Sequence, residues 1–285
     1  MSSIPTIKLT SCFVLSLSLC FSLSGQSLRC CYLHEYTVVE NRKCFLKDYN
    51  LCIEIDGEHI TCYSENEFLK DSTITAMFAA GEGYSQTQNS ANKYPDGVSW
   101  FIFGNLQQGS YTEYNSHFAL FFEGHGVYEQ PEWTLSDETA EICGYLCTKA
   151  SAQYLGRFWT IWFTPDIPVN AGPWLLWGAP GLILKAEDDQ GLFRFSCEMM
   201  APINHLRREI LLEHFKETSD RRGGHYYVRD IAEMEILYTK VKRFPAFNDE
   251  LTGSITSVYD SNGQKKNISS LPYIPLIPDE YWENN

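Results

Sequence analysis

The sequence lacks the short motifs that mark the common catalytic and metal-binding sites. It contains no G-x-S-x-G nucleophile turn, no H-E-x-x-H zinc helix and no C-x-x-C dithiol. The Gly-Glu-Gly segment at 81–83 lacks the third glycine and the strand–turn–helix context of a dinucleotide-binding loop. These absences argue against the usual hydrolases, zinc proteases and nucleotide-binding enzymes, and we expect neither a cofactor nor a metal centre.

Positive charge and long apolar runs are also scarce. Lys and Arg number 22 against 36 Asp and Glu, which gives a formal net charge of −14. Such an acidic surface repels phosphate backbones, so we expect no nucleic-acid partner. The apolar run Ser11–Ser24 is shorter than the roughly 20 residues that span a bilayer. We therefore expect no transmembrane helix in the chain that follows it.

The N-terminal segment is typical of a secretory signal peptide. Lys8 precedes the apolar run, and the small residues Ser24 and Gly25 end it, which is the order of charged, apolar and cleavage regions in export signals. We predict a signal peptide at 1–25 and a single domain at 26–285, exported to the periplasm or the outer-membrane face. Removing the peptide takes away Lys8 and no acidic residue, so the net charge moves from −14 to −15.

An even number of cysteines in an exported chain predicts disulfides. Because Cys30 and Cys31 are adjacent, an extended backbone points them to opposite faces, and they need different partners. Asp56-Gly57 is a hairpin signal between Cys52 and Cys62. A strict two-residue turn at this point aims the two cysteines at different faces of the sheet. A register that is offset by one residue places them opposite each other. The sequence leaves the pairing open. The eight cysteines are Cys30, Cys31, Cys44, Cys52, Cys62, Cys143, Cys147 and Cys197.

Strand-like runs separated by turn residues predict a mainly β fold built on a single curved antiparallel sheet. Several runs alternate apolar and polar residues, which is typical of a sheet with one face covered. The runs are Leu51–Ile55, His59–Tyr63, Val98–Phe103, His117–Phe122, Arg157–Phe163, Leu182–Ala186 and Leu192–Glu198. The turn signals are Asp56-Gly57, Tyr94–Gly97, Gly124–Gly126 and Asp188–Gly191.

Two later segments differ from this pattern. Apolar residues at helical spacing predict one amphipathic helix at 203–218. Ile231–Phe244 is strand-like, although Ala232–Glu235 also suits a helix. The tail 271–285 contains three prolines, so we expect it to run extended over the surface.

The stretch 157–184 combines aromatic runs with proline and glycine. Pro180 followed by Gly181 predicts a type II turn, and Leu182–Leu184 then enters a strand buried on both faces. Trp162, Trp174 and Trp177 lie around this corner. One interpretation is a folding corner that holds strands in register. The alternative is a rigid aromatic rim that binds a ligand or partner.

Three other constellations are weaker candidates for chemistry. Each has residues of a suitable type, but nothing else in the sequence converges on it. They are a Cys147 thiol with His205 or His214 as its base, a metal site at His117, Glu123 and His125, and a calcium site at Glu187–Gln190, which we interpret as a solvated hairpin tip.

Four motifs in order identify a family resemblance: the chain resembles the GLPGLI family of exported Bacteroidota proteins. The name-giving motif departs from the family pattern only at Ala179. The motifs are Gly144-Tyr145-x-Cys147-x-Lys149-Ala150, Trp162-Phe163-Thr164-Pro165-Asp166-Ile167-Pro168, Gly172-Pro173 and Gly178-Ala179-Pro180-Gly181-Leu182-Ile183.

This resemblance implies an open, curved sheet with a helix, similar to the half-barrels of lipoprotein carriers. It also implies a periplasmic or outer-membrane-facing protein without an established enzymatic activity, accessory to TonB-dependent uptake or envelope assembly. We therefore expect a non-enzymatic protein that binds a hydrophobic ligand such as a lipid, a peptide or an outer-membrane receptor. The alternative is a periplasmic hydrolase or metalloenzyme.

Overall fold

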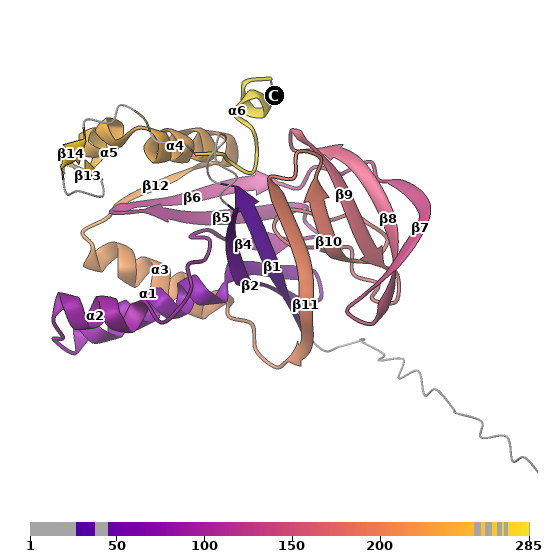
Figure 1. The fold of residues 1–285 in the computed structure, drawn as a ribbon, viewed down its shortest axis with the longest axis horizontal. Coiled ribbons are helices and arrows are strands. Elements are labelled where there is room, and N and C mark those ends of the chain that lie inside the picture. The colour runs from indigo at the N-terminus through magenta and orange to yellow at the C-terminus, as the bar shows by residue number, and fades with distance from the viewer. Residues whose placement is uncertain are drawn as a thin grey trace, which may run out of the picture.

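The computed structural model describes residues 27–37, 45–253, 258–259, 264–266, 270 and 273–284. The predicted signal peptide and Cys44 lie outside these ranges. The described residues contain a twelve-stranded sheet in the order β12-β6-β5-β4-β3-β2-β1-β11-β10-β9-β8-β7 (Figure 1). All neighbouring strands of this open sheet run antiparallel except the parallel pair β6 and β12. The predicted mainly β fold with one antiparallel sheet is confirmed.

The strands of the sheet alternate with short connections over most of the chain. They are β1 (Ser27–Thr37), β2 (Phe45–Asp56), β3 (His59–Ser64), β4 (Phe101–Asn105), β5 (Ser110–His117), β6 (Leu120–Val127), β7 (Thr134–Ile142), β8 (Tyr145–Tyr154), β9 (Arg157–Thr164), β10 (Leu182–Asp188), β11 (Phe193–Ile203) and β12 (His225–Asp230). A separate two-stranded sheet consists of β13 (Val258–Tyr259) and β14 (Lys265–Lys266).

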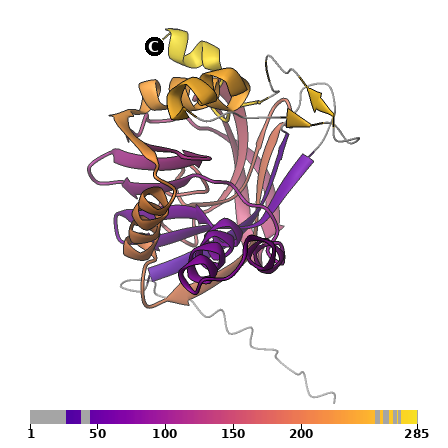
Figure 2. The ribbon, with the colours of Figure 1, turned by 90° about the vertical axis from the view of Figure 1, so that its left-hand side faces the viewer.

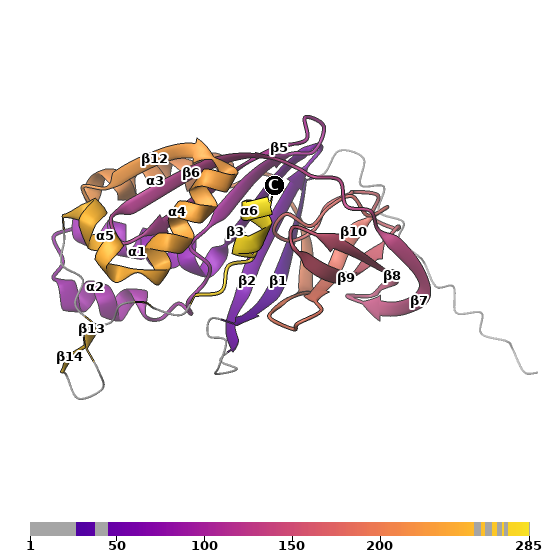
Figure 3. The same cartoon turned by 90° about the horizontal axis from the view of Figure 1, so that it is seen from above.

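Helices cover both faces of the β5–β6–β12 end of the sheet. Figures 1 and 2 show α4 and α5 on one side and α1, α2 and α3 on the other. The view from above shows the strands β7–β10 at the opposite end (Figure 3). The helices are α1 (Glu65–Ala79), α2 (Tyr84–Ala91), α3 (Arg208–Arg221), α4 (Ile231–Arg243), α5 (Pro245–Thr252) and α6 (Asp279–Asn284).

The alternation of side chains along β6 explains why this end of the sheet needs two helical layers. Leu120 and Phe122 point to one face and pack with Met234 of α4, whereas Phe121 points to the other face and packs with Phe215 of α3. A strand with large apolar residues on both faces must be covered twice. The predicted helix at 203–218 corresponds to α3.

The structure corrects the strand-like interpretation of 231–244, which forms α4. Asp230 caps this helix by accepting a hydrogen bond from the Glu233 amide at 2.9 Å. Met234, Tyr238 and Val241 then follow at helical spacing and are all buried. The β-branched and aromatic residues of the segment favoured a strand in the sequence, but packing on β6 decides for the helix.

Three predicted turns or strands are also placed differently. The run His117–Phe122 is broken by a hairpin turn at Phe118, whose φ is +54°. The turn predicted at Gly124–Gly126 lies inside β6 instead. The β2–β3 hairpin pairs Asp56 with His59, so its turn is Gly57-Glu58 and not Asp56-Gly57.

That register decides against a Cys52–Cys62 disulfide. Cys52 lies opposite Tyr63, and Cys62 lies opposite Ile53, so the two sulfurs point to different faces of the sheet. The disulfides predicted from the sequence are absent from the described residues: no two of their seven cysteines lie at bonding distance. Cys30 and Cys31 point to opposite faces as predicted and belong to separate core clusters.

The corner at 165–181 ends β9 and starts β10. Leu182, Ile183 and Leu184 are fully buried, as predicted. The turn at Pro180 is tighter than the predicted type II turn, because the Gly181 amide donates to the Ala179 carbonyl, two residues earlier, at 2.8 Å. A side chain on Gly181 would lie 2.1 Å from the Thr164 carbonyl oxygen. Glycine therefore lets this corner pass close against the end of β9.

The described part of the C-terminal tail is not confined to the surface. Pro275 and Ile277 are buried, and the chain then forms α6. Across the described ranges, no helix combines the length and the apolar character needed to cross a bilayer.

We predict that Gly181→Ala destabilises the fold strongly. A Cβ there would meet backbone atoms of Thr164 that cannot move without disrupting β9. Gly57→Ala is the matched control, because Gly57 has a φ of +59° but no heavy atom within 4 Å of the added carbon. Chemical denaturation should show a loss of about 1 kcal/mol for the control and at least about 2 kcal/mol more for Gly181→Ala. Equal losses would contradict the close-approach explanation.

Candidate functional site

A cavity of about 260 Å³ lies between the sheet, α4 and the C-terminal tail. It is lined by strands β1, β2, β5 and β11, by the segment before β4, by the corner at 165–181, by one face of α4 and by the tail. Aromatic side chains make up much of its wall. The lining residues are His34, Tyr36, Leu46, Gly97, Val98, Ser99, Trp100, Glu113, Asn115, Trp174, Phe193, Glu235, Tyr238, Lys242, Tyr273, Ile274, Leu276 and Ile277.

The close approach of α4 to the sheet places polar groups in this cavity. Glu113 lies opposite Gly124 in the β5–β6 ladder. A side chain on Gly124 would come within 2.9 Å of Met234 in α4, so the glycine makes room for the helix. The helix then directs Glu235 toward the strand that bears Glu113. Glu235, Tyr238 and Lys242 share one helix face because they are three and four residues apart.

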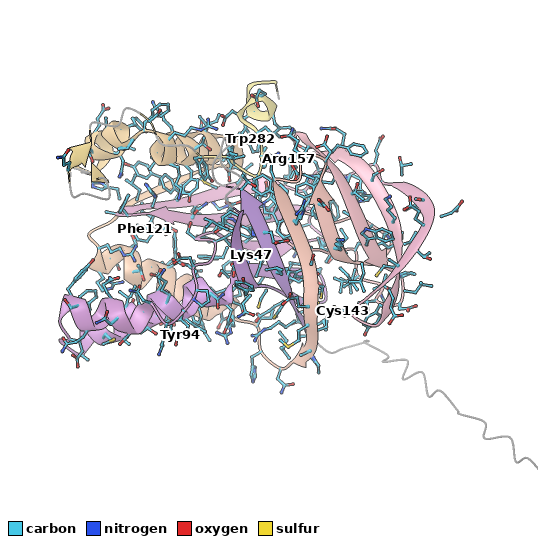
Figure 4. All side chains as sticks on the ribbon, in the orientation of Figure 1. Lys47, Tyr94, Phe121, Cys143, Arg157 and Trp282 are labelled. Atoms are coloured by element: carbon cyan, nitrogen blue, oxygen red, sulfur yellow. The ribbon has the colours of Figure 1, made fainter. Side chains whose placement is uncertain are left out.

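The tail forms another wall of the cavity and is held by Arg157. The Arg157 guanidinium donates to the carbonyl oxygens of Leu276 at 2.6 Å and of Pro275 at 2.8 Å, and to a carboxylate oxygen of Asp188 at 3.2 Å. Arg157 lies beside the C-terminal segment in Figure 4. Asp188 is buried and also accepts hydrogen bonds from the Leu192 and Phe193 amides, so the predicted solvated hairpin tip is wrong at this residue.

Glu113 and Glu235 form a hydrogen-bonded carboxyl pair inside the cavity. Burial, and next the charge of Glu235, raise the pKa of Glu113 well above its usual value. Burial also raises the pKa of Glu235 to about 7. Two carboxyl groups in contact in a desolvated site cannot both ionise easily, so they share a proton. Among the described residues, no ion pair with a basic side chain includes either of them.

A short chain of hydrogen bonds extends from this carboxyl pair. The Asn115 amide nitrogen lies 3.4 Å from a Glu113 carboxyl oxygen, and the Asn115 oxygen accepts from the Ser99 hydroxyl at 2.9 Å. The Ser99 hydroxyl also lies 3.2 Å from the Tyr238 hydroxyl. Donors and acceptors thus alternate along one side of the cavity, which fixes the orientation of each group.

His34 brings a buried polar group that lacks a partner. Its ring is stacked between Tyr36 and Phe195, with centroid distances of 4.8 and 4.4 Å, and it is only 1% exposed. Neither ring nitrogen makes a hydrogen bond to any residue that the structure describes. Burial lowers the pKa of His34 to about 3, so the ring is neutral. Buried polar atoms are rarely left unpaired; both nitrogens are sealed from the cavity space, so a ligand would reach them only after the wall shifts.

Lys242 supplies a basic group to the same cavity. Burial lowers its pKa below the usual value for lysine. Its ammonium lies 5.7 Å from the Tyr238 ring centroid and 5.5 Å from the Tyr273 ring centroid, within the range of cation–π contacts. The cavity therefore combines aromatic surface with an acidic pair, a neutral imidazole and a lysine. Such clusters of perturbed titratable groups are typical of functional sites.

The three tryptophans of the sequence-predicted rim are not brought together. Trp174 is buried and lines the cavity, where it packs against Trp159. Trp162 is on the other face of β9 from Trp159 and lies near Lys149. Trp177 packs on Tyr128 and donates its indole hydrogen to the Glu129 carbonyl.

The remaining family-motif residues surround the corner between β9 and β10 or lie on β8. Ile167 and Ala179 are buried, and a side chain on Gly172 would lie 2.8 Å from Ile183. Gly178 has a φ of +79°. Gly144 forms the β7–β8 turn with a φ of +78°, followed by Tyr145 and the buried Cys147 on β8. These contacts place the motif in the packing of the sheet.

The weaker candidates are also separated in space. Cys147 is buried in the main core cluster, whereas His214 packs on Phe68 between α1 and α3. His117 and His125 lie at opposite ends of the β5–β6 hairpin. Within the described ranges, no group of three or more histidine, cysteine or acidic side chains could hold a metal ion.

Sequence reasoning missed Glu113, Glu235, Lys242 and His34. Glu235 and Lys242 lie on one face of α4, which the sequence did not identify as a helix, and Glu113 and His34 lie on β5 and β1, so no spacing in the chain relates the strand residues to the helix residues. The one local signal was the Asp230 cap followed by Met234, Tyr238 and Val241, which would have identified α4 and the helix face that bears Glu235.

We predict that Glu113→Gln reduces the pH dependence of stability. The pair holds a proton in the folded protein that glutamates of the unfolded chain release near pH 4.3. The free energy of unfolding should therefore fall as pH rises from about 5 to about 8. In Glu113→Gln this fall should be smaller, whereas Glu198→Gln, at an exposed site, should keep it. Denaturant titrations at both pH values measure the free energy of unfolding of wild type and the two variants. An equal change in this free energy between the two pH values for all three proteins would contradict the shared proton.

Comparisons with known proteins agree with the fold but assign no activity. The family described as "Protein of unknown function (Porph_ging)" matches residues 157–185, and this match fits a family of the Bacteroidota. Two solved structures of PNGF-II, in different space groups, are 16% and 15% identical, with TM-scores of 0.51 and 0.50. Each alignment covers 77% of this chain and 34% of that one, so the chain spans about a third of their length. No curated protein matches the chain. At this identity the likeness shows a β-rich fold alone.

Proposed function

We propose that this protein is an exported, non-enzymatic cell-envelope protein of the GLPGLI type that binds a small ligand in the cavity under α4. The observation that carries the proposal is the carboxyl pair Glu113–Glu235 next to the cavity space, together with the unpartnered His34. Burying such groups costs folding free energy, and a functional role would explain why the fold keeps them. Ligand binding is such a role.

The lining of the cavity limits the chemistry of the ligand. A volume of about 260 Å³ is slightly below the roughly 300–1,000 Å³ of common small-molecule sites. The ligand is therefore small, or a larger lipid or peptide inserts one group. Tyr36, Trp100 and Trp174 offer apolar ring faces, and the carboxyl pair offers both a hydrogen-bond donor and an acceptor. A partly apolar molecule with at least one polar group fits this lining.

Export and family membership are supported by different observations. The segment 1–25 has the pattern of a signal peptide. The family match at 157–185 covers the Trp162–Pro168 and Gly178–Ile183 motifs that resemble the GLPGLI family. We extend the proposal to a location in the periplasm or at the outer-membrane face, where an outer-membrane receptor of TonB-dependent uptake is the partner of the loaded protein.

The carboxyl pair also favours a second candidate, a hydrolase in which one carboxyl acts as a general acid and the other as a general base. Paired carboxyl groups with separated pKa values perform such reactions in other folds. The two candidates differ in what the purified protein retains. A binding protein retains an intact ligand in wild type, whereas a hydrolase retains its substrate only when Glu113 or Glu235 is replaced.

We predict that protein purified from its native envelope carries a bound small molecule and that Ile274→Trp does not. Ile274 is half-buried in the cavity wall, so an indole there fills the space. Leu106→Trp is the control, because Leu106 is also half-buried but packs on the core elsewhere. Native mass spectrometry should show extra mass for wild type and Leu106→Trp only. Repeated recovery of wild type without extra mass would refute the binding proposal.

A further inference from the structure

Two cysteines on neighbouring central strands face each other directly. Cys31 of β1 and Cys52 of β2 are register partners in the antiparallel pair. Their sulfur atoms lie 3.1 Å apart. Residues that face each other across antiparallel strands have Cα separations of about 4.5–5.5 Å, which is within the range that a disulfide spans. The backbone at this point therefore already has the geometry that a covalent bridge requires.

The strand register shows that Cys30, the neighbour of Cys31 in the chain, cannot be the partner of Cys52. Cys30 points to the opposite face of β1 and packs with Tyr32 in the main core cluster. Cys31 packs instead with Tyr63 and Phe101 beneath α3. Because the sheet separates the two faces, Cys30 cannot reach Cys52 without reversing the strand.

The burial of the pair decides when it can react. The thiolate is the form that attacks a disulfide, and the oxidant must be able to reach it. Both residues are buried in the folded protein, at 6% and 2% exposure, so the reaction takes place while the strands are still assembling.

We propose that Cys31 and Cys52 are joined by a disulfide bond when the chain folds in an oxidising compartment, which rests on the export proposed above. The Cys31 thiolate attacks the disulfide of an oxidant such as a thiol–disulfide oxidoreductase or glutathione disulfide. One oxidant sulfur leaves as a thiolate, and a mixed disulfide forms. The Cys52 thiolate then attacks the Cys31 sulfur and releases the second oxidant thiol. Two protons and two electrons thus leave the cysteines, and one S–S bond forms.

Such a bond would fix the two strands on which the cavity depends. His34 lies three residues after Cys31 on β1, and the register partner of His34 on β2 is Asp48. The chain between the cysteines includes the 38–44 connection, so the bridge closes a loop and restricts the unfolded chain. The disulfide therefore stabilises the part of the sheet that carries the unpartnered imidazole.

Peptide mapping under non-reducing conditions tests the proposal. The full chain is refolded from denaturant with a mixture of reduced and oxidised glutathione, and free thiols are then alkylated. Fragmentation spectra should show a peptide in which Cys31 is linked to Cys52, at a mass lower than the sum of its parts by two hydrogens. Recovery of Cys31 or Cys52 as an alkylated thiol, or linked to another cysteine such as Cys44, would overturn the proposal.

Three variants make the assignment specific. The linked peptide should disappear in Cys31→Ala and persist in Cys30→Ala, which separates the two adjacent residues. It should also persist in Cys62→Ala, a buried cysteine on the neighbouring strand that points to the other face. The same mapping on protein recovered from the native envelope tests export separately: a link in refolded protein but not in envelope protein contradicts the oxidising location and leaves the pairing supported.

Discussion

The contact between α4 and the sheet at Gly124 is the constraint on which the rest of the site depends. An added Cβ would lie 2.9 Å from the Met234 Cε atom, 3.0 Å from the Ile231 Cδ1 atom and 3.1 Å from the Met234 Cβ atom, so these side chains would have to shift away from β6. Glu235 follows Met234 in α4, so its position near Glu113 depends on this contact. A single missing side chain therefore sets the distance between two elements that are far apart in the chain.

A second set of contacts closes the cavity from the other direction. Arg157 lies at the start of β9 and binds the backbone of the tail as well as the buried Asp188. One guanidinium thus joins the β9–β10 hairpin to the wall that carries Ile274 and Leu276. Arginine suits this position because its planar group donates several hydrogen bonds in fixed directions. The corner at 165–181 contributes to the cavity separately, through Trp174 in its wall.

The cavity has more buried polar chemistry than a fold of this kind needs. An apolar cluster of the same volume would be as stable or more stable than a desolvated carboxyl pair. Burial raises the pKa of Glu235 to about 7, so the carboxyl pair can accept or donate a proton near neutral pH, whereas His34 stays neutral and Lys242 has a pKa below its usual value. This combination supports a site that recognises a ligand.

The sequence by itself determined the mainly β class, the positions of six strands of the large sheet (β2, β3, β4, β9, β10 and β11), the helix α3 and the burial of Leu182–Leu184. Those features follow from alternation, helical spacing and turn chemistry, which are local. Only the tertiary structure decided that 231–244 is a helix, that Cys31 faces Cys52 and that Glu113 meets Glu235. Each of these depends on which faces of distant segments pack together, and a one-residue change in register reverses every side chain of a strand.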